Sequence, residues 1–320
     1  MVRRAFLLVL AAVVLVAVPS ALGAGPPPPT GTIVVSRDLD FDDRGDELFA
    51  VDVRSGAERN LTNHPAVDET PAISSRGDIA FSTDRDGNLE LYVLHVSGAL
   101  RRVTQTASFD EFTPAWSPNG QKLAFTRAPA GGLDACLGPP FTGCTTFGIY
   151  VMRADGSGAP QLLSDAAGAE DSGPRWSPNG KRISFTSDRT GDYEVWVINA
   201  DGTGETNLTN SPTTTDGFTW PPASWSPDGR RLAFGRTTAF DLSLFEIHVM
   251  HADGSNVQQL TDAETQGTAF TPVWSPNGRQ IAFVRLLETG GDLFVMNADG
   301  TGQQTVKNTP EPEHSYDWGR

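Results

Sequence analysis

The stretch TPAWSPNGQKLAF, residues 113–125, contains a pentapeptide that recurs along this chain. WSPNG returns unchanged at residues 176–180 and 274–278, and WSPDG stands at 225–229. In each copy, Pro presets φ for the first turn position, and Gly can adopt the left-handed conformation that closes the turn. A turn that recurs in this way indicates an internal repeat, which governs the interpretation of the rest of the sequence.

Four kinds of short segment follow one another in a fixed order. They are the PxWSPNG type, an apolar run such as KLAFTR, a run ending in a turn such as IYVMRADG, and a short run such as RRVTQ. The apolar runs alternate with period two or are short and β-branched, which is typical of strands. Four antiparallel strands every 43 to 60 residues predict the blades of a β-propeller.

The two ends of the chain predict how the ring of blades closes. TIVVSR (32–37) matches the second kind of segment, whereas EHSYDWGR (313–320) is a first segment with no partner after it. We therefore expect the C-terminal strand to be the innermost strand of the blade whose other three strands are N-terminal. Six copies of the second segment predict an all-β fold, a six-bladed propeller of four-stranded antiparallel blades over residues 31–320.

The first 23 residues have the pattern of a secretory signal peptide. Two arginines precede an unbroken apolar run from Ala5 to Val18, and small residues close the segment. The run has about 14 residues, whereas a bilayer span needs roughly 20. We predict a cleaved signal over residues 1–23, with an uncleaved anchor as the alternative. Four consecutive prolines then predict an extended spacer over residues 24–30.

The net charge of the chain limits the kinds of molecule that it is expected to bind. The chain has 24 Lys and Arg against 39 Asp and Glu, a net charge of −15, and loss of the two signal-peptide arginines makes it −17. This balance argues against nucleic acid and anionic membrane surfaces, because both bind basic proteins. It favours cations or a protein with a basic segment. No later stretch is apolar enough to cross a membrane.

The motifs resemble a known family. The order WSPNG, KLAFTR, LFVMNADG and LTN is similar to the WD40-like repeats of the TolB family of six-bladed propellers, and it covers nearly the whole chain after residue 31. The resemblance implies a periplasmic or secreted, non-catalytic scaffold that engages proteins at the mouth of its central channel. Members of the Tol system also carry an N-terminal α/β domain, where this sequence has only the PPPP spacer.

The repeated Trp and the SPNG turn have structural explanations. Five copies of the first segment carry Trp and one carries Ile73, so the position suits apolar packing between blades better than ligand stacking. Each such side chain stabilises the fold by about 3 kcal/mol when fully buried. The Ser and the Asn or Asp of the turn are turn formers.

Acidic residues precede each PxW and are harder to explain as scaffold. If PxW begins the innermost strand, they ring one mouth of the channel, where mutual repulsion is costly unless a cation or basic partner neutralises it. We therefore predict a partner site made of Asp68, Glu69, Asp110, Glu111, Glu170, Asp171, Asp216, Glu313 and His314. Ordinary acidic loops are the alternative.

Two further segments have the look of oxygen-ligand loops for Ca²⁺. One contains Asp38, Asp40 and Asp42, and the other is STDRDGNLE (82–90). Neither has the full ligand spacing, and hairpin turns between strands explain the same residues. We expect no cofactor, with Ca²⁺ at Asp38, Asp40 and Asp42 as the open alternative.

The two cysteines, Cys136 and Cys144, lie eight positions apart in one loop. In an exported protein they predict one local disulfide. A free thiol pair or half of a metal site is the alternative.

Catalytic motifs are scarce. The sequence has no GxSxG, HExxH or CxxC, and its five histidines are scattered. His248 and His251, three apart in one strand, are expected on opposite faces. We predict a monomeric binding scaffold rather than an enzyme. The alternatives are a metal-dependent propeller enzyme acting on carbohydrates or peptides and a purely structural module.

Overall fold

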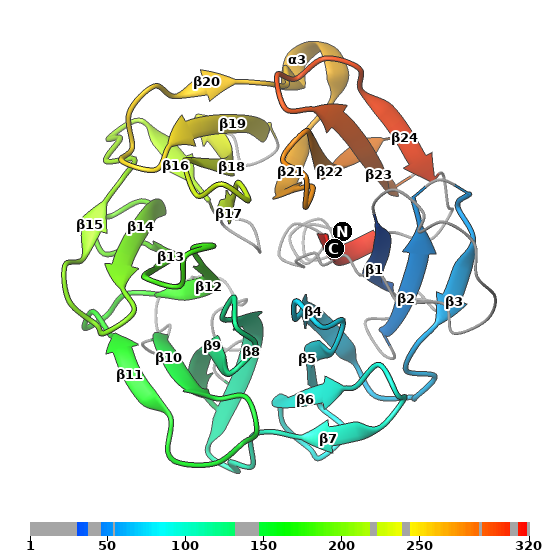
Figure 1. The fold of residues 1–320 in the computed structure, drawn as a ribbon. Helices are drawn as coiled ribbons and strands as arrows, with labels where there is room; N and C mark the ends of the chain where they lie inside the picture. Colours follow the sequence, from blue (N-terminus) through cyan, green and yellow to red (C-terminus); the bar gives the residue numbers. More distant parts are fainter. Residues whose placement is uncertain are drawn as a thin grey trace.

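The computed structural model describes residues 31–37, 46–53, 55–131, 147–217, 223–238, 244–287, 290–307 and 313–318, and for 238, 287, 290, 307 and 313–316 it describes the backbone alone. The described strands form six sheets arranged as blades around a central axis (Figure 1). Among these residues the one helix is α3 (Ala263–Gln266), and none is long and apolar enough to span a membrane. The all-β, six-bladed prediction is confirmed.

Each blade is a four-stranded antiparallel sheet, and its strands are numbered in chain order. Blade 1 contains β25 (Glu313–Trp318), β1 (Thr32–Arg37), β2 (Glu47–Asp52) and β3 (Glu58–Asn60). Blade 2 contains β4 (Asp68–Ile73), β5 (Ile79–Thr83), β6 (Glu90–Leu94) and β7 (Leu100–Arg102). Blade 3 contains β8 (Phe109–Trp116), β9 (Lys122–Pro129), β10 (Gly148–Arg153) and β11 (Gln161–Ser164).

Blade 4 contains β12 (Ser172–Trp176), β13 (Arg182–Ser187), β14 (Glu194–Asn199) and β15 (Thr206–Asn207). Blade 5 has a divided innermost strand, because β16 (Thr214–Asp216) and β17 (Ala223–Trp225) both pair with β18 (Arg231–Thr238). Its outer strands are β19 (Glu246–His251) and β20 (Gln258–Gln259). Blade 6 contains β21 (Ala269–Trp274), β22 (Gln280–Leu287), β23 (Gly290–Asn297) and β24 (Gln304–Lys307).

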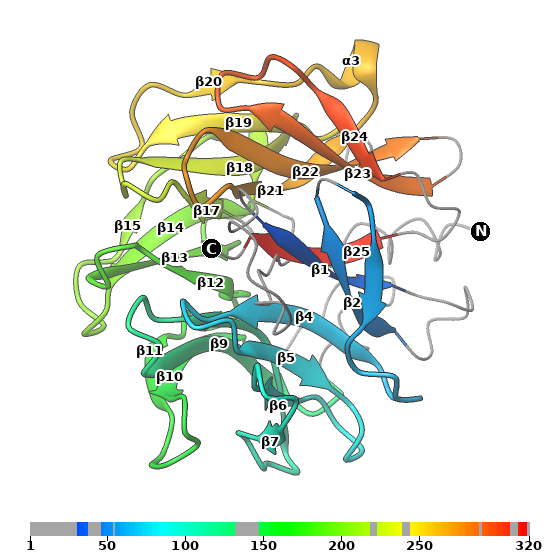
Figure 2. The same cartoon turned by 45° about the vertical axis from the view of Figure 1, so that its right-hand side comes forward.

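The ring closes through blade 1, as the two ends of the sequence predict. β25 pairs antiparallel with β1, with Val35 opposite Tyr316 and Ile33 opposite Trp318. Figure 2 shows the red β25 beside the dark blue β1. Strands from the two ends of the chain therefore share one sheet.

The innermost strands begin earlier than the sequence indicated. PxW does not begin the strand but ends it: β8 runs from Phe109 and reaches Pro114 only in its last residues. The register with β9 shifts between Phe112 and Ala115, which is a β-bulge, and Thr113 in the bulge has φ 50°. Asp68, Glu111 and Asp216 therefore lie within innermost strands and share their alternation, whereas Asp171 comes directly before β12.

The hydrophobic core is divided among the junctions between blades. Between blades 2 and 3, for example, Leu91 and Val93 pack with Leu123 and Phe125. The repeated Trp lies at these junctions, and the Trp116 indole N–H donates to the carbonyl oxygen of Ala72 in the neighbouring blade at 2.8 Å. The predicted packing role of the Trp is confirmed.

Candidate functional site: the rim of the central channel

Four of the predicted acidic residues are fully buried near the start of an innermost strand. Asp68, Glu111, Asp171 and Asp216 each have 0% of their surface exposed. In the strand pairing, Asp216 lies opposite Arg236 in the same way as Glu111 lies opposite Arg127. Asp216 is therefore the blade 5 equivalent of Glu111, although extra residues separate β16 from β17 in that blade. The structure thus brings these four carboxylates to equivalent places in blades 2 to 5.

Each of these carboxylates meets an arginine from its own blade. Arg85 Nη2 lies 2.7 Å from Asp68 Oδ1, and Arg127 Nε lies 2.9 Å from Glu111 Oε1. The other two pairs are Arg189 with Asp171 at 2.6 Å and Arg236 with Asp216 at 2.6 Å. The expectation that only an external cation or partner neutralises this ring is therefore wrong for these four carboxylates, because the chain supplies the cations.

The arginines are held by aromatic rings on the same face of the blade. The Arg85 guanidinium lies 5.0 Å from the centre of the Tyr92 ring, and that of Arg189 lies 4.6 Å from the Trp196 ring. Such contacts combine cation–π attraction with packing of the side-chain stem. The arginine stands two residues after the repeated Phe in AFTR and AFGR, and four after it in FSTDR and FTSDR. Both spacings place it on the face of that Phe, because strands alternate with period two.

These arginines are the residues that the sequence interpretation missed. Their signal was present, because an Arg follows the repeated Phe with even spacing in blades 2 to 6. Blade 6 has Ala269 at the acidic position, and there Arg285 Nη2 donates instead to Gln266 at 3.1 Å and Gln303 at 2.7 Å.

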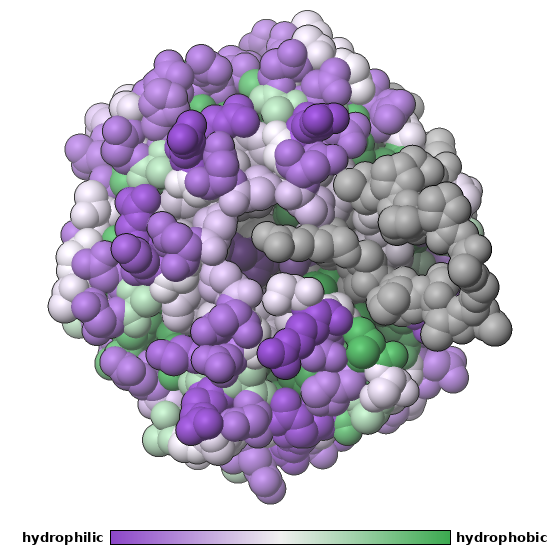
Figure 3. Space-filling view, in the orientation of Figure 1, coloured by the Kyte–Doolittle hydropathy of each residue, from purple (hydrophilic) through white to green (hydrophobic). Residues whose placement is uncertain are grey.

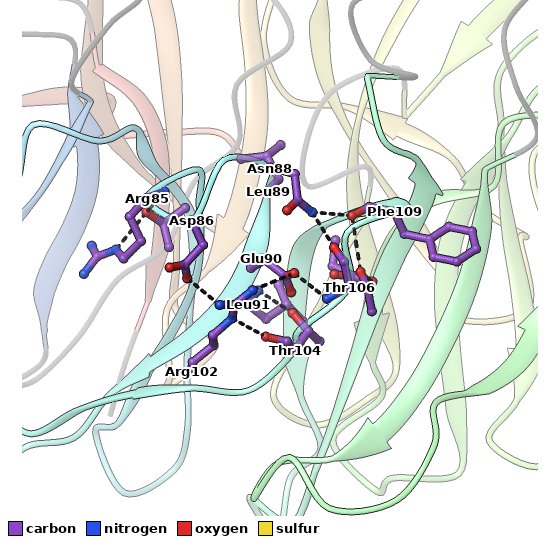
Figure 4. Close-up of polar contacts among 12 residues, drawn as sticks. Arg85, Asp86, Asn88, Leu89, Glu90, Leu91, Arg102, Thr104, Thr106 and Phe109 are labelled. Carbon is purple, nitrogen blue, oxygen red and sulfur yellow. Dashed lines mark hydrogen bonds and ion pairs between the residues drawn. The ribbon is translucent and has the colours of Figure 1, made fainter.

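Glu90 supplies a further buried carboxylate close to the boundary between blades 2 and 3 (Figure 4). Glu90, at the start of β6, accepts a hydrogen bond from the Thr106 backbone N–H at 2.5 Å, and the Thr106 hydroxyl donates to Glu111 at 2.8 Å. The Oε2 atoms of Glu90 and Glu111 are buried without a hydrogen-bond partner among the described residues. Burial raises the pKa of Glu111 to about 7, against the opposing effects of Thr106 and Arg127.

Glu69 and Glu170 are the half-buried members of the predicted acidic set among the described residues. No hydrogen bond or ion pair to the Glu69 carboxylate is found within the described ranges. Burial raises the pKa of Glu69 to about 7, and the charges of Asp84 and Asp110 add to this effect. Figure 3 shows a hollow at the centre of one face, with hydrophilic surface inside and around it.

The remaining predicted residues have different surroundings. Asp110 is buried and accepts from the backbone N–H groups of Leu89 at 3.0 Å and Gly131 at 2.7 Å, so it ties two loops together. Glu170 accepts from the Tyr193 hydroxyl. Glu313 and His314 belong to β25, but their side chains are not among those described.

The structure describes only some of the residues predicted to bind a metal ion or to form the disulfide. Asp38, Asp40, Asp42, Cys136 and Cys144 lie outside the described residues, as do the predicted signal and spacer. In the second loop, Asp84 accepts from the Val67 N–H at 2.9 Å and Asp86 lies 3.0 Å from Arg102, so both have structural partners. The described part of the chain contains no group of three or more His, Cys, Asp or Glu able to hold a metal.

The histidines of β19 lie on opposite faces, as expected. His248 is 7% exposed and its ring lies 5.9 Å from that of Phe234, whereas His251 is exposed. Burial lowers the pKa of His248 to about 4. The pair therefore offers no joint ligand site.

Comparison with solved structures shows the same fold in proteins of low sequence identity. TolB from Acinetobacter baumannii has a TM-score of 0.72 at 17% identity, over 90% of this chain and 66% of that one. An oligogalacturonate lyase in complex with manganese has a TM-score of 0.57 at 15% identity, over 81% of this chain and 70% of that one. Likeness at such identities shows the fold alone.

Sequence comparison is more specific. A protein TolB homolog from Chlorobium luteolum is 32% identical over 162 residues, which are 50% of this chain and 33% of the relative. The chain spans about a third of the length of the curated relatives it matches. The family model described as the TolB beta propeller domain matches residues 142–319. Because this match covers more than half of the chain, the protein belongs to the TolB beta propeller domain family.

Proposed function

We propose that this protein is an exported, non-catalytic scaffold that works without a cofactor and binds a protein or peptide with a basic segment at the channel mouth. Two relatives are named Tol-Pal system protein TolB, which supports a role beside other proteins of one system. The predicted signal peptide supports a periplasmic or secreted location. The observation that supports this proposal most directly concerns Glu69. Its carboxylate is half-buried, has two acidic neighbours and has no cation beside it among the described residues.

We expect a basic side chain to bind more tightly at Glu69 than at the carboxylates that already have an arginine partner. A carboxylate whose pKa is raised by burial and by like charges is stabilised in its charged form when a cation arrives. The arginine-paired carboxylates are already neutralised and fully buried, so they shape the rim rather than contact the partner.

The test uses short lysine-rich peptides and composition-matched acidic peptides, with binding measured by fluorescence anisotropy. We expect the basic peptide to bind and Glu69→Gln to weaken it by about tenfold, a loss of roughly 1.4 kcal/mol. Binding to the unmodified protein should also weaken as the pH falls below 7, and the Gln variant should lose this dependence. Glu264→Gln, which removes an exposed carboxylate in α3, is the matched control.

Equal binding by both variants would place the partner elsewhere on the surface. The competing function, a metal-dependent enzyme, has the oligogalacturonate lyase as its structural parallel. Turnover of polygalacturonate or of peptides with added Mn²⁺ or Ca²⁺ would overturn the proposal of a non-catalytic scaffold.

A further inference from the structure

The residue immediately before the repeated Trp, or before Ile73 in blade 2, is small or apolar in four blades and charged in the other two. The six residues at this position are Ala72, Ala115, Arg175, Ser224, Val273 and Asp317. Arg175 is in β12 of blade 4 and Asp317 is in β25 of blade 1. In a ring of six these blades are opposite each other, as Figure 1 shows.

Both charged side chains contact the innermost strand of a neighbouring blade. Arg175 Nη1 donates to the carbonyl oxygen of Pro114 in β8 at 3.3 Å, and Asp317 Oδ2 accepts from the N–H of Ile73 in β4 at 3.4 Å. Each side chain thus reaches along the wall of the channel toward blades 2 and 3, which lie between them. Asp317 is also the charge that acts on Arg175 from across the channel.

Each of the two side chains makes fewer hydrogen bonds and ion pairs than it could. No ion pair within 4.0 Å joins Arg175 to Asp317 or to any other carboxylate of the described residues. A guanidinium has five N–H donors and favours a planar carboxylate, yet Arg175 makes one long hydrogen bond to a carbonyl. The arginines at the rim of blades 2 to 5 each have a carboxylate partner, whereas Arg175 has none among the described residues.

Both charged side chains are half-buried. Burial lowers the pKa of Arg175 and raises that of Asp317, so the surroundings disfavour the charged form of each. An occupant that brings one charge of each sign would satisfy both ends at once.

We propose that the channel binds a small zwitterion of the amino-acid class, with its carboxylate on Arg175 and its ammonium group on Asp317. This site is separate from the partner site at Glu69. A ligand with one charge satisfies one end and leaves the other unpaired, which costs affinity because an unpaired buried charge is expensive.

The experiment is a ladder of ω-amino acids, namely glycine, β-alanine, 4-aminobutyrate and 6-aminohexanoate, titrated by calorimetry into the full chain. The distance between ligand charges grows along the ladder, so one member should bind best. Its N-acetylated and amidated forms, each with one charge, should bind at least about tenfold more weakly. Arg175→Met and Asp317→Asn should each weaken the best member by a similar factor, whereas Arg153→Met, which changes an arginine that is 69% exposed, should not.

A channel filled only with water gives a different pattern. No member would then bind saturably up to about 10 mM, a concentration far above the Kd of most specific sites. The double variant Arg175→Met, Asp317→Asn would still melt at a higher temperature than the parent, because two half-buried charges without an ion-pair partner are removed. Equal binding by parent and double variant would likewise overturn the proposal. Arg175→Lys, which keeps the charge, tests whether a loss of binding reflects misfolding, because it should retain part of the affinity.

Discussion

Buried carboxylates are tolerated in this protein because arginines lie against them. Asp216 is 0% exposed and receives two hydrogen bonds from Arg236, at 2.6 and 2.7 Å, in a geometry that matches the fork of a guanidinium. Such a pair adds little net stability over an apolar pair, since both groups lose hydration. Removal of one partner is different, because the other charge stays buried.

Arg236→Met should therefore destabilise the protein by about 3 kcal/mol, measured by urea denaturation. The double variant Asp216→Leu, Arg236→Met should recover much of this loss, because no unpaired charge remains. Arg153→Met is the control, since Arg153 and Asp155 form an exposed pair at 3.6 Å whose removal should leave the unfolding free energy nearly unchanged. Similar losses for Arg236→Met and Arg153→Met would show that the Asp216 pair is not effectively buried.

Glu111 should make stability depend on pH. Its folded pKa of about 7 lies above its ordinary value of 4.5, so folding favours the protonated form. Its contribution is fully present below about pH 4.5 and is lost as the pH rises through 7. The folded pKa of His248 is about 4, against 6.5, so its contribution is present above pH 6.5 and is lost as the pH falls toward 4.

The window from pH 6.5 to 8.5 therefore isolates the carboxyl groups. There the unfolding free energy of the unmodified protein should fall by an amount on the order of 2 kcal/mol. Glu111→Gln should reduce this slope, because the amide does not titrate, and Glu69→Gln should reduce it by a similar amount, because the pKa of Glu69 is also raised from 4.5 to about 7. Urea denaturation at several pH values measures the slope, and parallel curves for parent and Glu111→Gln would rule out this origin.

At the scale of elements, the turn between the third and fourth strands is a contact between blades. Gly254 has φ 85°, and a Cβ atom there would lie 2.5 Å from the carbonyl oxygen of Leu208 in the preceding blade. Gly98 occupies the same turn position in blade 2 with φ 83°, but a Cβ atom there would meet nothing within 4 Å. The two glycines differ only in whether a neighbour is present.

Gly254→Ala should therefore cost more stability than Gly98→Ala. Both variants strain a left-handed residue by about 1 kcal/mol, and Gly254→Ala must also displace backbone, which adds a further 1–3 kcal/mol. Thermal denaturation of the two variants measures the difference. Equal losses would show that blade 5 moves away from blade 4 at little cost.

Local patterns explain how much of these elements could be predicted. Period-two runs and SPNG turns are set by residues close in sequence, so strands, blade number and Trp packing follow from the sequence. The state of the carboxylates does not, because each arginine lies 16 to 20 positions away and reaches its partner only after strand pairing. Equally, nothing local indicates that Glu69 is half-buried while Asp68 beside it is fully buried.

At the scale of the whole molecule, the blades are held as a ring by junction cores and by one shared sheet. Trp318 of β25 packs with Ile33 and Val35 of β1 and with Val284 and Val295 of blade 6. The C-terminal strand therefore contributes to a blade and to a junction. Its loss would leave the edge of β1 with unpaired backbone groups, which attract other strands.

A chain that ends at Lys307 should therefore lose closure. We expect its thermal midpoint to fall by several degrees, since loss of the Trp318 side chain alone removes about 3 kcal/mol of burial. We also expect self-association through β1, measured by light scattering after gel filtration. A synthetic peptide of residues 308–320, added in trans, should restore the monomer and the midpoint by pairing with β1 in the register that places Val35 opposite Tyr316. A scrambled peptide should do neither, because it cannot place an aromatic side chain opposite Ile33. If the truncated chain is monomeric with an unchanged midpoint, the junction cores alone hold the ring, and β25 completes a blade without closing the molecule.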